Sequence, residues 1–411
     1  MTKEVALRCG AIALERLLEG EDGSSLGRQC ACGGTFVDKK HNRPKALRTV
    51  LGEVTLRRRS QRCNRCGRWR VAEDEVLDVV RTGFSPGLRR MMAKTGAERC
   101  FDKASAQILE LAGVSVTDKD VERVSEMIGE DVAQWEQHRV NAALNGEPVD
   151  AVEAPPTLYI ASDGTGVPVL RRETEGRCGK AKDGIARSRE AKLGAVFTQS
   201  IVDEEGKPVR DPRSTTYVGK IESSESFGAR LYAEALRRGF SEEGRVAFLG
   251  DGALWLWNIA GTHFPGAQQI VDYYHATEHL SAVAHTLYPD AEEQRTSWLE
   301  KEKKTLWEGQ INSLIKNLRS FRLRGARGKL VEKEIGYFEK NAHRMRYDVF
   351  RQMGLFIGSG VVEAGCKSLI GGRLKQSGMH WTVRGANAII ALRCCIESGT
   401  FEDYWESRRA A

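Results

Sequence analysis

The chain has 411 residues, enough for two to three domains, and its formal net charge is +7. It shows no internal repeat, no signal peptide and no apolar span long enough to cross a membrane. We therefore expect a cytoplasmic protein with reduced thiols and no membrane partner. The positive charge is local, because residues 28–70 hold thirteen Lys or Arg against two acids, a net of +11. Such a local excess of cations indicates a partner rich in phosphate.

Two cysteine pairs follow an N-terminal helix that we expect over residues 1–27. Each pair ends in glycine, and the alternating segment 50–56 between the pairs is typical of a strand. Two such knuckles joined by strand-like sequence predict a zinc ribbon over residues 28–74, in which four thiolates hold one structural Zn²⁺. The first pair has one intervening residue where two are usual, which leaves His41 open as a substitute ligand. The predicted zinc ligands are Cys30, Cys32, Cys63 and Cys66.

Arginine is concentrated around the second cysteine pair. A local run of cations is the footprint of a phosphate-binding module, so we expect this part of the ribbon to bind DNA. A solvated ribbon surface is the plainer alternative. The predicted DNA contacts here are Arg57, Arg58, Arg59, Arg62, Arg65, Arg68 and Arg70.

Residues 75–148 are predicted to be helical. A helix that ends at Ala112, a turn over residues 113–115 and a second helix capped by Thr117 follow the order of a helix-turn-helix. The second helix carries more acidic than basic residues in its first turns, which is unfavourable for reading a DNA groove. DNA contact and a dimerising or spacing role therefore both stay open for this unit.

Two apolar runs in the next segment, residues 155–280, are each followed by Asp-Gly, and the acids are Asp163 and Asp251. Because groups at the carboxyl ends of neighbouring strands point into the crevice where ligands sit, we expect these carboxylates to lie together. Carboxylates that close repel each other unless a cation shares them. Two Mg²⁺ ions held there can activate an attacking oxygen and neutralise a leaving one. Taken singly, such a segment more often indicates a strand that ends in an ordinary turn.

The order of the elements predicts the fold. The strand before Asp163 is followed by strand-like segments at residues 193–202 and 215–221 and by a helix that ends at Gly239. The Asp251 strand, a short helix, a strand over residues 269–272 and a further helix come next. Three antiparallel strands, a helix, a strand, a helix and a strand predict an α/β protein with a ribonuclease H-like mixed sheet. That fold is known for catalytic carboxylates at the ends of its first and fourth strands.

A long gap separates Asp251 from a third acid, Glu363, so residues 281–355 are predicted to form an all-helical insertion. Lys and Arg recur along it, which suits either a DNA-gripping role or a plain helical decoration. Residues 356–411 then form the C-terminal part of the core. We expect Glu363 on the first turns of a helix, where Ser359 can bond the free amides.

Basic residues continue beyond Glu363. Lys367 lies four residues on and shares the helix face of Glu363. Beside a metal site these residues would hold phosphates, and Trp381 could stack on a freed base, although core packing is the plainer role for it. The predicted DNA contacts in this segment are Lys367, Arg373, Lys375, Trp381 and Arg384.

A resemblance to a known family covers nearly the whole chain. The stretches that carry it are Ser162-Asp163-Gly164-Thr165-Gly166, Gly250-Asp251-Gly252-Ala253, Asp272-Tyr273-Tyr274-His275 and Gly358-Ser359-Gly360-Val361-Val362-Glu363. On these the chain resembles the ISKra-type bacterial insertion-sequence transposases, within the DDE transposases that have a ribonuclease H-like catalytic core. The resemblance implies that Asp163, Asp251 and Glu363 bind two Mg²⁺ or Mn²⁺ ions per active site.

The resemblance also implies a catalytic role for Asp272 and His275, whose spacing matches an Asp-x-x-His signature of related transposases. A single His after a strand is more often structural, and that alternative stays open for His275. The expected activity is metal-dependent cleavage at insertion-sequence ends, followed by strand transfer into target DNA. The implied partner is double-stranded DNA, as transposon ends and as target, bound by a homodimer or a higher assembly. A domesticated zinc-ribbon regulator with a silent core and a structure-selective nuclease are the alternative functions.

Overall fold

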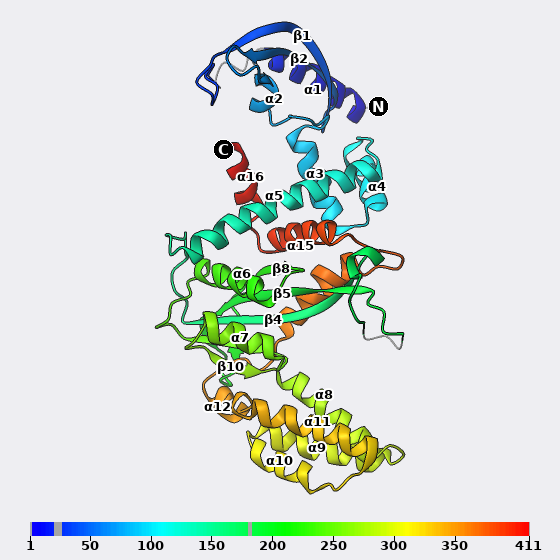
Figure 1. The fold of residues 1–411 in the computed structure, drawn as a ribbon, viewed down its shortest axis with the longest axis vertical. Coiled ribbons are helices and arrows are strands. Elements are labelled where there is room, and N and C mark those ends of the chain that lie inside the picture. Colours follow the sequence, from blue (N-terminus) through cyan, green and yellow to red (C-terminus); the bar gives the residue numbers. More distant parts are fainter. Residues whose placement is uncertain (1, 20–26, 180–182, 411) are drawn as a thin grey trace. The chain divides into compact units, whose positions relative to one another are not determined.

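Figure 1 shows a computed structural model of the chain, which describes residues 2–19, 27–179 and 183–410. Two compact units divide the chain, Met1–Ile128 and Gly129–Ala411, and each is described by itself. The long helix α5 (Asp118–Leu144) supplies residues to both units. Among the described residues, no helix is long and apolar enough to span a membrane.

The first unit contains an antiparallel sheet in the order β1-β2-β3. Its strands are β1 (Phe36–Thr49), β2 (Gly52–Cys63) and β3 (Trp69–Val71). The strand expected over residues 50–56 begins only at Gly52, because Val50 and Leu51 form the turn of the β1-β2 hairpin. Helix α1 (Thr2–Glu19) packs through Ala11 on the hairpin, so the alternating apolar residues of both strands share one core with it. The hairpin residues of this core are Leu47, Val54 and Leu56.

The helices of the first unit begin and end at residues suited to those positions. They are α2 (Ala72–Val76), α3 (Pro86–Glu98), α4 (Phe101–Ala112) and the start of α5. Helix α4 ends at Gly113, whose φ of 74° lies in the left-handed region that favours glycine. Thr117 then caps α5: its hydroxyl accepts from the Asp120 amide at 3.1 Å, and the Asp120 carboxylate accepts from the Thr117 amide at 3.2 Å. A helix, a turn and a helix therefore follow one another here.

The second unit is built on a mixed five-stranded sheet in the order β10-β9-β4-β5-β8. Strand β4 pairs antiparallel with β5 and β5 antiparallel with β8, whereas β9 runs parallel to both β4 and β10. Strand β5 ends earlier than expected, because Ile201 and Val202 belong to the separate hairpin β6-β7. The strands are β4 (Thr157–Pro168), β5 (Ser188–Gln199), β6 (Ile201–Val202), β7 (Pro208–Val209), β8 (Thr216–Lys220), β9 (Val246–Gly250) and β10 (Gln268–Val271).

Helices cover both faces of this sheet. A Cβ on Gly194 of β5 would meet Leu231 of α6 (Ser224–Arg237), whereas the adjacent Leu193 lies against Gly365 of α13 (Gly360–Gly365). Successive strand residues point to opposite faces, so α6 and α13 lie on opposite sides of the sheet. The remaining helices around the sheet are η2 (Arg171–Thr174), α7 (Leu254–His263), α14 (Gly372–Leu374), α15 (Val383–Glu397) and α16 (Phe401–Ala410).

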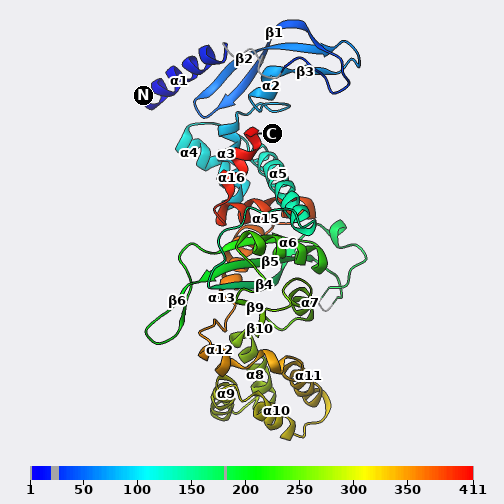
Figure 2. The ribbon, with the colours of Figure 1, turned by 90° about the vertical axis from the view of Figure 1, so that its left-hand side faces the viewer.

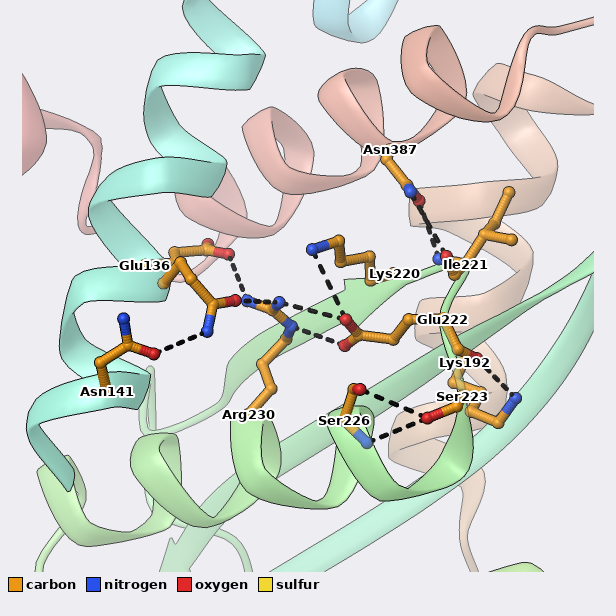
Figure 3. A network of polar contacts seen from close by, with 11 residues as sticks. Glu136, Asn141, Lys192, Lys220, Ile221, Glu222, Ser223, Ser226, Arg230 and Asn387 are labelled. Atoms are coloured by element: carbon orange, nitrogen blue, oxygen red, sulfur yellow. Dashed lines mark hydrogen bonds and ion pairs between the residues drawn. The ribbon is translucent and has the colours of Figure 1, made fainter. Parts of the chain in front are cut away.

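A buried ionic network joins α6 to the part of α5 in this unit (Figure 3). Arg230 of α6 lies 3.6 Å from a carboxylate oxygen of Glu136 and donates to Glu222 at 2.9 Å. Lys220 lies 3.5 Å from the same Glu222. Arg230 is 3% exposed, so these acids are neutralised by cations of the protein itself.

A group of helices lies beyond the β10 edge of the sheet in both views (Figures 1 and 2). Its members pack on buried Leu306, Leu314, Leu318, Ile335 and Phe338. The helices are α8 (Tyr273–Leu287), α9 (Glu292–Trp307), α10 (Ile311–Ser320), α11 (Gly325–Asn341), η3 (Ala342–Arg344) and α12 (Tyr347–Gln352).

Candidate metal and nucleic-acid sites

The four cysteines named from the sequence lie together in the first unit. Their sulfur atoms are all within 4.8 Å of one another, with Cys30 and Cys66 at 3.7 Å and Cys32 and Cys63 at 3.5 Å. Zinc bonds to sulfur are about 2.3 Å long, so a tetrahedral ion separates its sulfurs by about 3.8 Å. The observed spacing fits a structural zinc site. The side chain of His41 lies outside the described part of the structure.

The backbone explains why these thiols converge. Each knuckle closes through a glycine with positive φ, Gly33 at 80° and Gly67 at 72°. A Cβ on the next glycine, Gly34, would lie 2.8 Å from the Cys63 sulfur, so only glycine lets the two knuckles approach this closely. Hydrogen bonds from the Cys66 and Arg65 amides lower the pKa of Cys63 to about 6, which favours the thiolate that a metal needs.

The seven arginines of the ribbon differ in what they contact. Arg58 bonds Asp74 at 2.7 Å and Arg59 bonds Glu73 at 3.2 Å, and both acids belong to α2 and are buried. These two arginines are therefore paired within the protein, and their contact with DNA stays a prediction. Arg65 donates to the Cys32 carbonyl at 2.6 Å.

The other four arginines include the most accessible ones. Arg57, Arg62 and Arg68 are exposed, as is Arg65. Arg62 lies over the Trp69 ring, and Arg70 lies 4.1 Å from the centre of the Phe36 ring. The accessible charge of the ribbon is therefore smaller than the sequence count suggests.

Asp163, Asp251 and Glu363 line one pocket of about 580 Å³ in the second unit. Strand β4 continues past Asp163 to Pro168, so Asp163 is not at the end of its strand as expected. Strand β9, however, pairs with β4 only as far as Ala161 and ends at Gly250. Asp163 therefore lies two residues beyond the last β4 residue that pairs with β9. Asp251 directly follows the end of β9, so the two acids lie near the same end of this strand pair. The pocket is lined by Ser162, Asp163, Thr165, Asp251, Tyr274, His275, Glu278, Ser359, Glu363, Cys366, Lys367, Gly371 and Lys375.

Each of the three carboxylates is oriented by a neighbour. Asp163 accepts from the Gly164 amide at 2.6 Å, and Asp251 accepts from the Ala253 amide at 2.9 Å. Ser359 precedes α13 as expected, but its hydroxyl bonds Glu363 at 3.2 Å and caps no backbone amide. The side chain predicted to cap the helix thus positions the acid instead.

The pocket is short of positive charge at its acids. Burial raises the pKa of Asp163, and the charge of Asp251 adds to this, while the Gly164 amide opposes it. Within the described residues, no Lys or Arg forms an ion pair with any of the three carboxylates. Among the described residues, the four cysteines are the one group of possible metal ligands whose ligand atoms all lie within 4.8 Å of one another. The oxygen atoms of the three carboxylates are therefore farther apart than the cysteine sulfurs.

Asp272 and His275 have different surroundings. Asp272 is fully buried, and its two oxygens accept from the amides of His275, at 2.8 Å, and of Ser359. It therefore ties the start of α8 to the segment before Glu363, while its catalytic role stays a prediction. His275 does line the pocket, 3.5 Å from Glu278.

Lys367 and Lys375 lie on the pocket wall, and Lys375 donates to the Thr165 hydroxyl. Glu363, Lys367, Gly371 and Lys375 are spaced four residues apart and form a stripe along the pocket wall. In an α-helix four residues turn by about 400°, so such a stripe would rotate by about 40° at each step and leave the pocket. The π-helix η4 (Cys366–Gly371) has a wider turn, closed by bonds five residues apart, which offsets this rotation.

The remaining predicted contacts of this segment do not line the pocket. Trp381 is 7% exposed and donates its ring NH to the Leu374 carbonyl at 3.1 Å. Arg373 is fully buried beside the Trp381 ring. Both side chains pack in the core, and their contact with DNA stays a prediction. Arg384 is exposed and pairs with Glu130, with one bond of 2.6 Å.

Several pocket residues were missed from the sequence. Glu278 lies three residues after His275 and Cys366 three residues after Glu363, so helical spacing could have indicated both. Tyr337 of α11 donates to the backbone carbonyl of Asp251 at 2.9 Å. No sequence pattern signals this contact between residues far apart in the chain.

The chain was compared with known proteins. No protein-family model matches it, and no curated protein sequence matches it. Among solved structures it is similar to the Drosophila P element transposase strand transfer complex, with 9% identity over 74% of this chain and 83% of that chain. The TM-score is 0.21, which is too low to support an argument about fold or activity.

Proposed function

We propose that the protein is a DNA transposase of the ISKra type, with a ribonuclease H-like catalytic core, which cuts insertion-sequence ends and joins them to target DNA. One observation carries the proposal: Asp163, Asp251 and Glu363, far apart in the sequence, line one pocket together with Lys367 and Lys375. The strand order β10-β9-β4-β5-β8, with β4 and β5 antiparallel and β4 and β9 parallel, supports the core assignment.

The pocket fits hard divalent cations. Its three carboxylates supply oxygen ligands of the kind that Mg²⁺ and Mn²⁺ prefer, and no protein cation among the described residues neutralises them. Asp163, Asp251 and Glu363 would hold two such ions. When bound, the ions would supply the charge neutralisation and the activated oxygen that phosphoryl transfer needs.

The side chains around the acids have separate tasks in this proposal. Lys367 and Lys375 hold phosphate oxygens of the DNA strand, because they are the cations on the pocket wall. His275 exchanges a proton with the leaving oxygen, since its ring lies on the same pocket. Asp272 positions both α8 and the segment that precedes Glu363 through its two amide bonds.

The cysteine site has a supporting task. A bound Zn²⁺ would fix the two knuckles and hold the exposed arginines Arg57 and Arg68 for contact with the element ends. In this proposal the protein acts as a homodimer or higher assembly on double-stranded DNA.

Labelled insertion-sequence ends, a supercoiled target and Mg²⁺ test the proposal. A transposase cuts the ends and joins them to the target, so joined product is the expected result. Cutting without joining would indicate a structure-selective nuclease instead. Binding to the ends without cutting would indicate a regulator whose core is silent. Omission of the metal is the control, and it should abolish cutting and leave end binding in place.

A further inference from the structure

The turn that carries Asp251 is held by a residue of another helix. The hydroxyl of Tyr337, on α11, donates to the backbone carbonyl of Asp251 at 2.9 Å. The same ring packs on Gly252, whose φ is 98°. A Cβ at Gly252 would lie 2.6 Å from the Tyr337 ring, so the turn and the ring fit each other only because that residue is glycine.

Tyr337 is itself fixed in place. Its ring stacks on the His279 ring with 3.7 Å between centres and 17° between planes. His279 in turn bonds Glu334, which lies three residues before Tyr337 on α11 and is buried. His279 belongs to α8, and its ring also contacts the ring of His275 at 5.0 Å. These contacts link α8, α11 and the Asp251 turn into one packed cluster.

The Asp251 side chain moves with its turn. Its carboxylate accepts from the Ala253 amide at 2.9 Å, so carboxylate and backbone form one small rigid unit. A tyrosine that fixes the backbone therefore also fixes the carboxylate. Metal ligands need placement to within about 0.5 Å, and outer partners that orient a ligand typically change metal affinity by roughly 10–100-fold.

We propose that Tyr337 is a positioning residue, which places Asp251 for a divalent cation and thereby couples the helical segment to the pocket. This inference rests on the proposed function, because it assumes that Asp251 binds metal. It assigns a task to α11 that does not require the helical segment to touch DNA. The hydroxyl supplies the effect, whereas the ring supplies packing.

The variant Tyr337→Phe separates these two contributions, because it keeps the ring on Gly252 and His279 and removes only the hydroxyl. Tyr347→Phe is the matched control. Tyr347 is fully buried, and its hydroxyl donates at 3.0 Å to the backbone carbonyl of Val271, so the same kind of bond is lost away from Asp251. Both variants should fold, which thermal unfolding followed by circular dichroism will check.

The readout is Mn²⁺ binding to full-length, zinc-loaded protein without DNA, measured by electron paramagnetic resonance. We expect Tyr337→Phe to weaken Mn²⁺ binding by about 10-fold and Tyr347→Phe to leave it unchanged. Cleavage by Tyr337→Phe should need more metal and recover when metal is saturating.

Two further results decide against the inference. Wild-type affinity in Tyr337→Phe, or an equal loss in Tyr347→Phe, overturns the positioning role. Asp251→Asn serves as the reference for the proposed function. If that variant binds Mn²⁺ as the wild type does, the metal assignment of Asp251 fails and the inference fails with it. If Asp251→Asn loses the ion and Tyr337→Phe does not, only the inference fails.

Discussion

The cysteine site and the carboxylate pocket are built in opposite ways. The four cysteine sulfurs already lie within 4.8 Å of one another, because two short turns closed by Gly33 and Gly67 place them. The acids of the pocket come from a strand, a turn and a helix that are distant in sequence, and they are held less closely. A structural metal site is closed by protein ligands, whereas a catalytic site keeps space for a substrate. The cysteine site fits the first description, and the second is what we propose for the carboxylate pocket.

Replacing one acid of the pocket should give the largest effect. Asp163→Asn, Asp251→Asn and Glu363→Gln each remove a proposed metal ligand from a pocket wall. We expect cleavage of element ends to fall by more than the roughly 100-fold typical of losing an outer partner of a metal ligand. The melting temperature should change little, because all three side chains are only partly buried and lie on a pocket wall.

End cleavage on gels and thermal unfolding check these variants together. Metal-dependent cutting at the wild-type rate by any one of them would remove that residue from the proposed set. A large loss of stability would show that the acid serves the fold, and the contrast with the cysteine site would then be wrong.

Replacing a cysteine should act on folding first. Cys63→Ser or Cys66→Ser breaks the four-thiolate set, and structural zinc in small modules contributes binding free energies of about 10–16 kcal/mol. We expect loss of about one zinc per chain, unfolding of the ribbon and weaker end binding. Metal analysis and limited proteolysis measure this, with the exposed Cys9→Ser as the matched control. Full zinc content in Cys63→Ser would contradict the site.

The two sites also differ in what the sequence predicts. The cysteine ligands are predictable from spacing, because neighbouring residues and glycine turns determine their geometry. The strand order is predictable from apolar runs, and Asp163 and Asp251 follow from the same runs. The position of Asp163 in the middle of β4 is not predictable in this way, because it depends on where the neighbouring strand β9 ends.

Burial is the second property that the sequence does not reveal. Arg373 and Trp381 belong to a basic stretch of sequence that is typical of a surface binding DNA, yet both side chains pack in the core. Asp272 is catalytic by its spacing alone, whereas the folded chain also buries it and bonds each of its oxygens to a backbone amide. Tyr337 reaches Asp251 from another helix, and only the folded chain brings the two together. Contacts between distant elements depend on packing, which periodicity does not encode.

A glycine pair tests whether the pocket is open to a substrate. Gly371 lines the pocket and Gly372 does not. A Cβ on Gly371 would meet only the Cys366 carbonyl, at 3.3 Å, and one on Gly372 only the Lys367 carbonyl, at 3.7 Å. The first contact is tight and the second is ordinary, so packing restricts Gly371 but does not explain Gly372, although Gly in a helix costs about 0.5–1 kcal/mol relative to Ala.

We expect Gly371→Ala to raise the DNA concentration needed for half-maximal cleavage by roughly 10-fold, which corresponds to about 1.4 kcal/mol. Gly372→Ala should cleave like the wild type. Circular dichroism must show that the π-helical segment still folds in both. Equal behaviour of the two variants would mean that this wall does not face the DNA.

The arginines of the ribbon provide a smaller test. Replacing the exposed Arg57 and Arg68 with Ala should make the slope of log affinity against log salt shallower by about 2 units or less, since each lost phosphate contact releases roughly one counterion fewer. Arg58→Ala is the contrasting variant, because it breaks a 2.7 Å ion pair with buried Asp74. It should lower the free energy of unfolding by about 1–3 kcal/mol instead. An unchanged slope in the double variant would place end recognition elsewhere in the chain.

The Glu136 network offers a reference for the pocket, because here a buried acid has a cation of the protein within reach (Figure 3). Burial raises the pKa of Glu136 to about 7, and Arg230 opposes this. A raised carboxyl pKa contributes stability that is fully present below the unfolded value, near 4.5, and is lost as pH rises through about 7. The free energy of unfolding should therefore fall by roughly 1–3 kcal/mol between pH 5 and 8 through this group. Glu136→Gln should flatten that part of the profile in thermal unfolding without changing Mn²⁺ binding. An unchanged slope in the variant between pH 5 and 8 would mean that Arg230 keeps Glu136 ionised throughout this range, as a paired buried carboxylate would be.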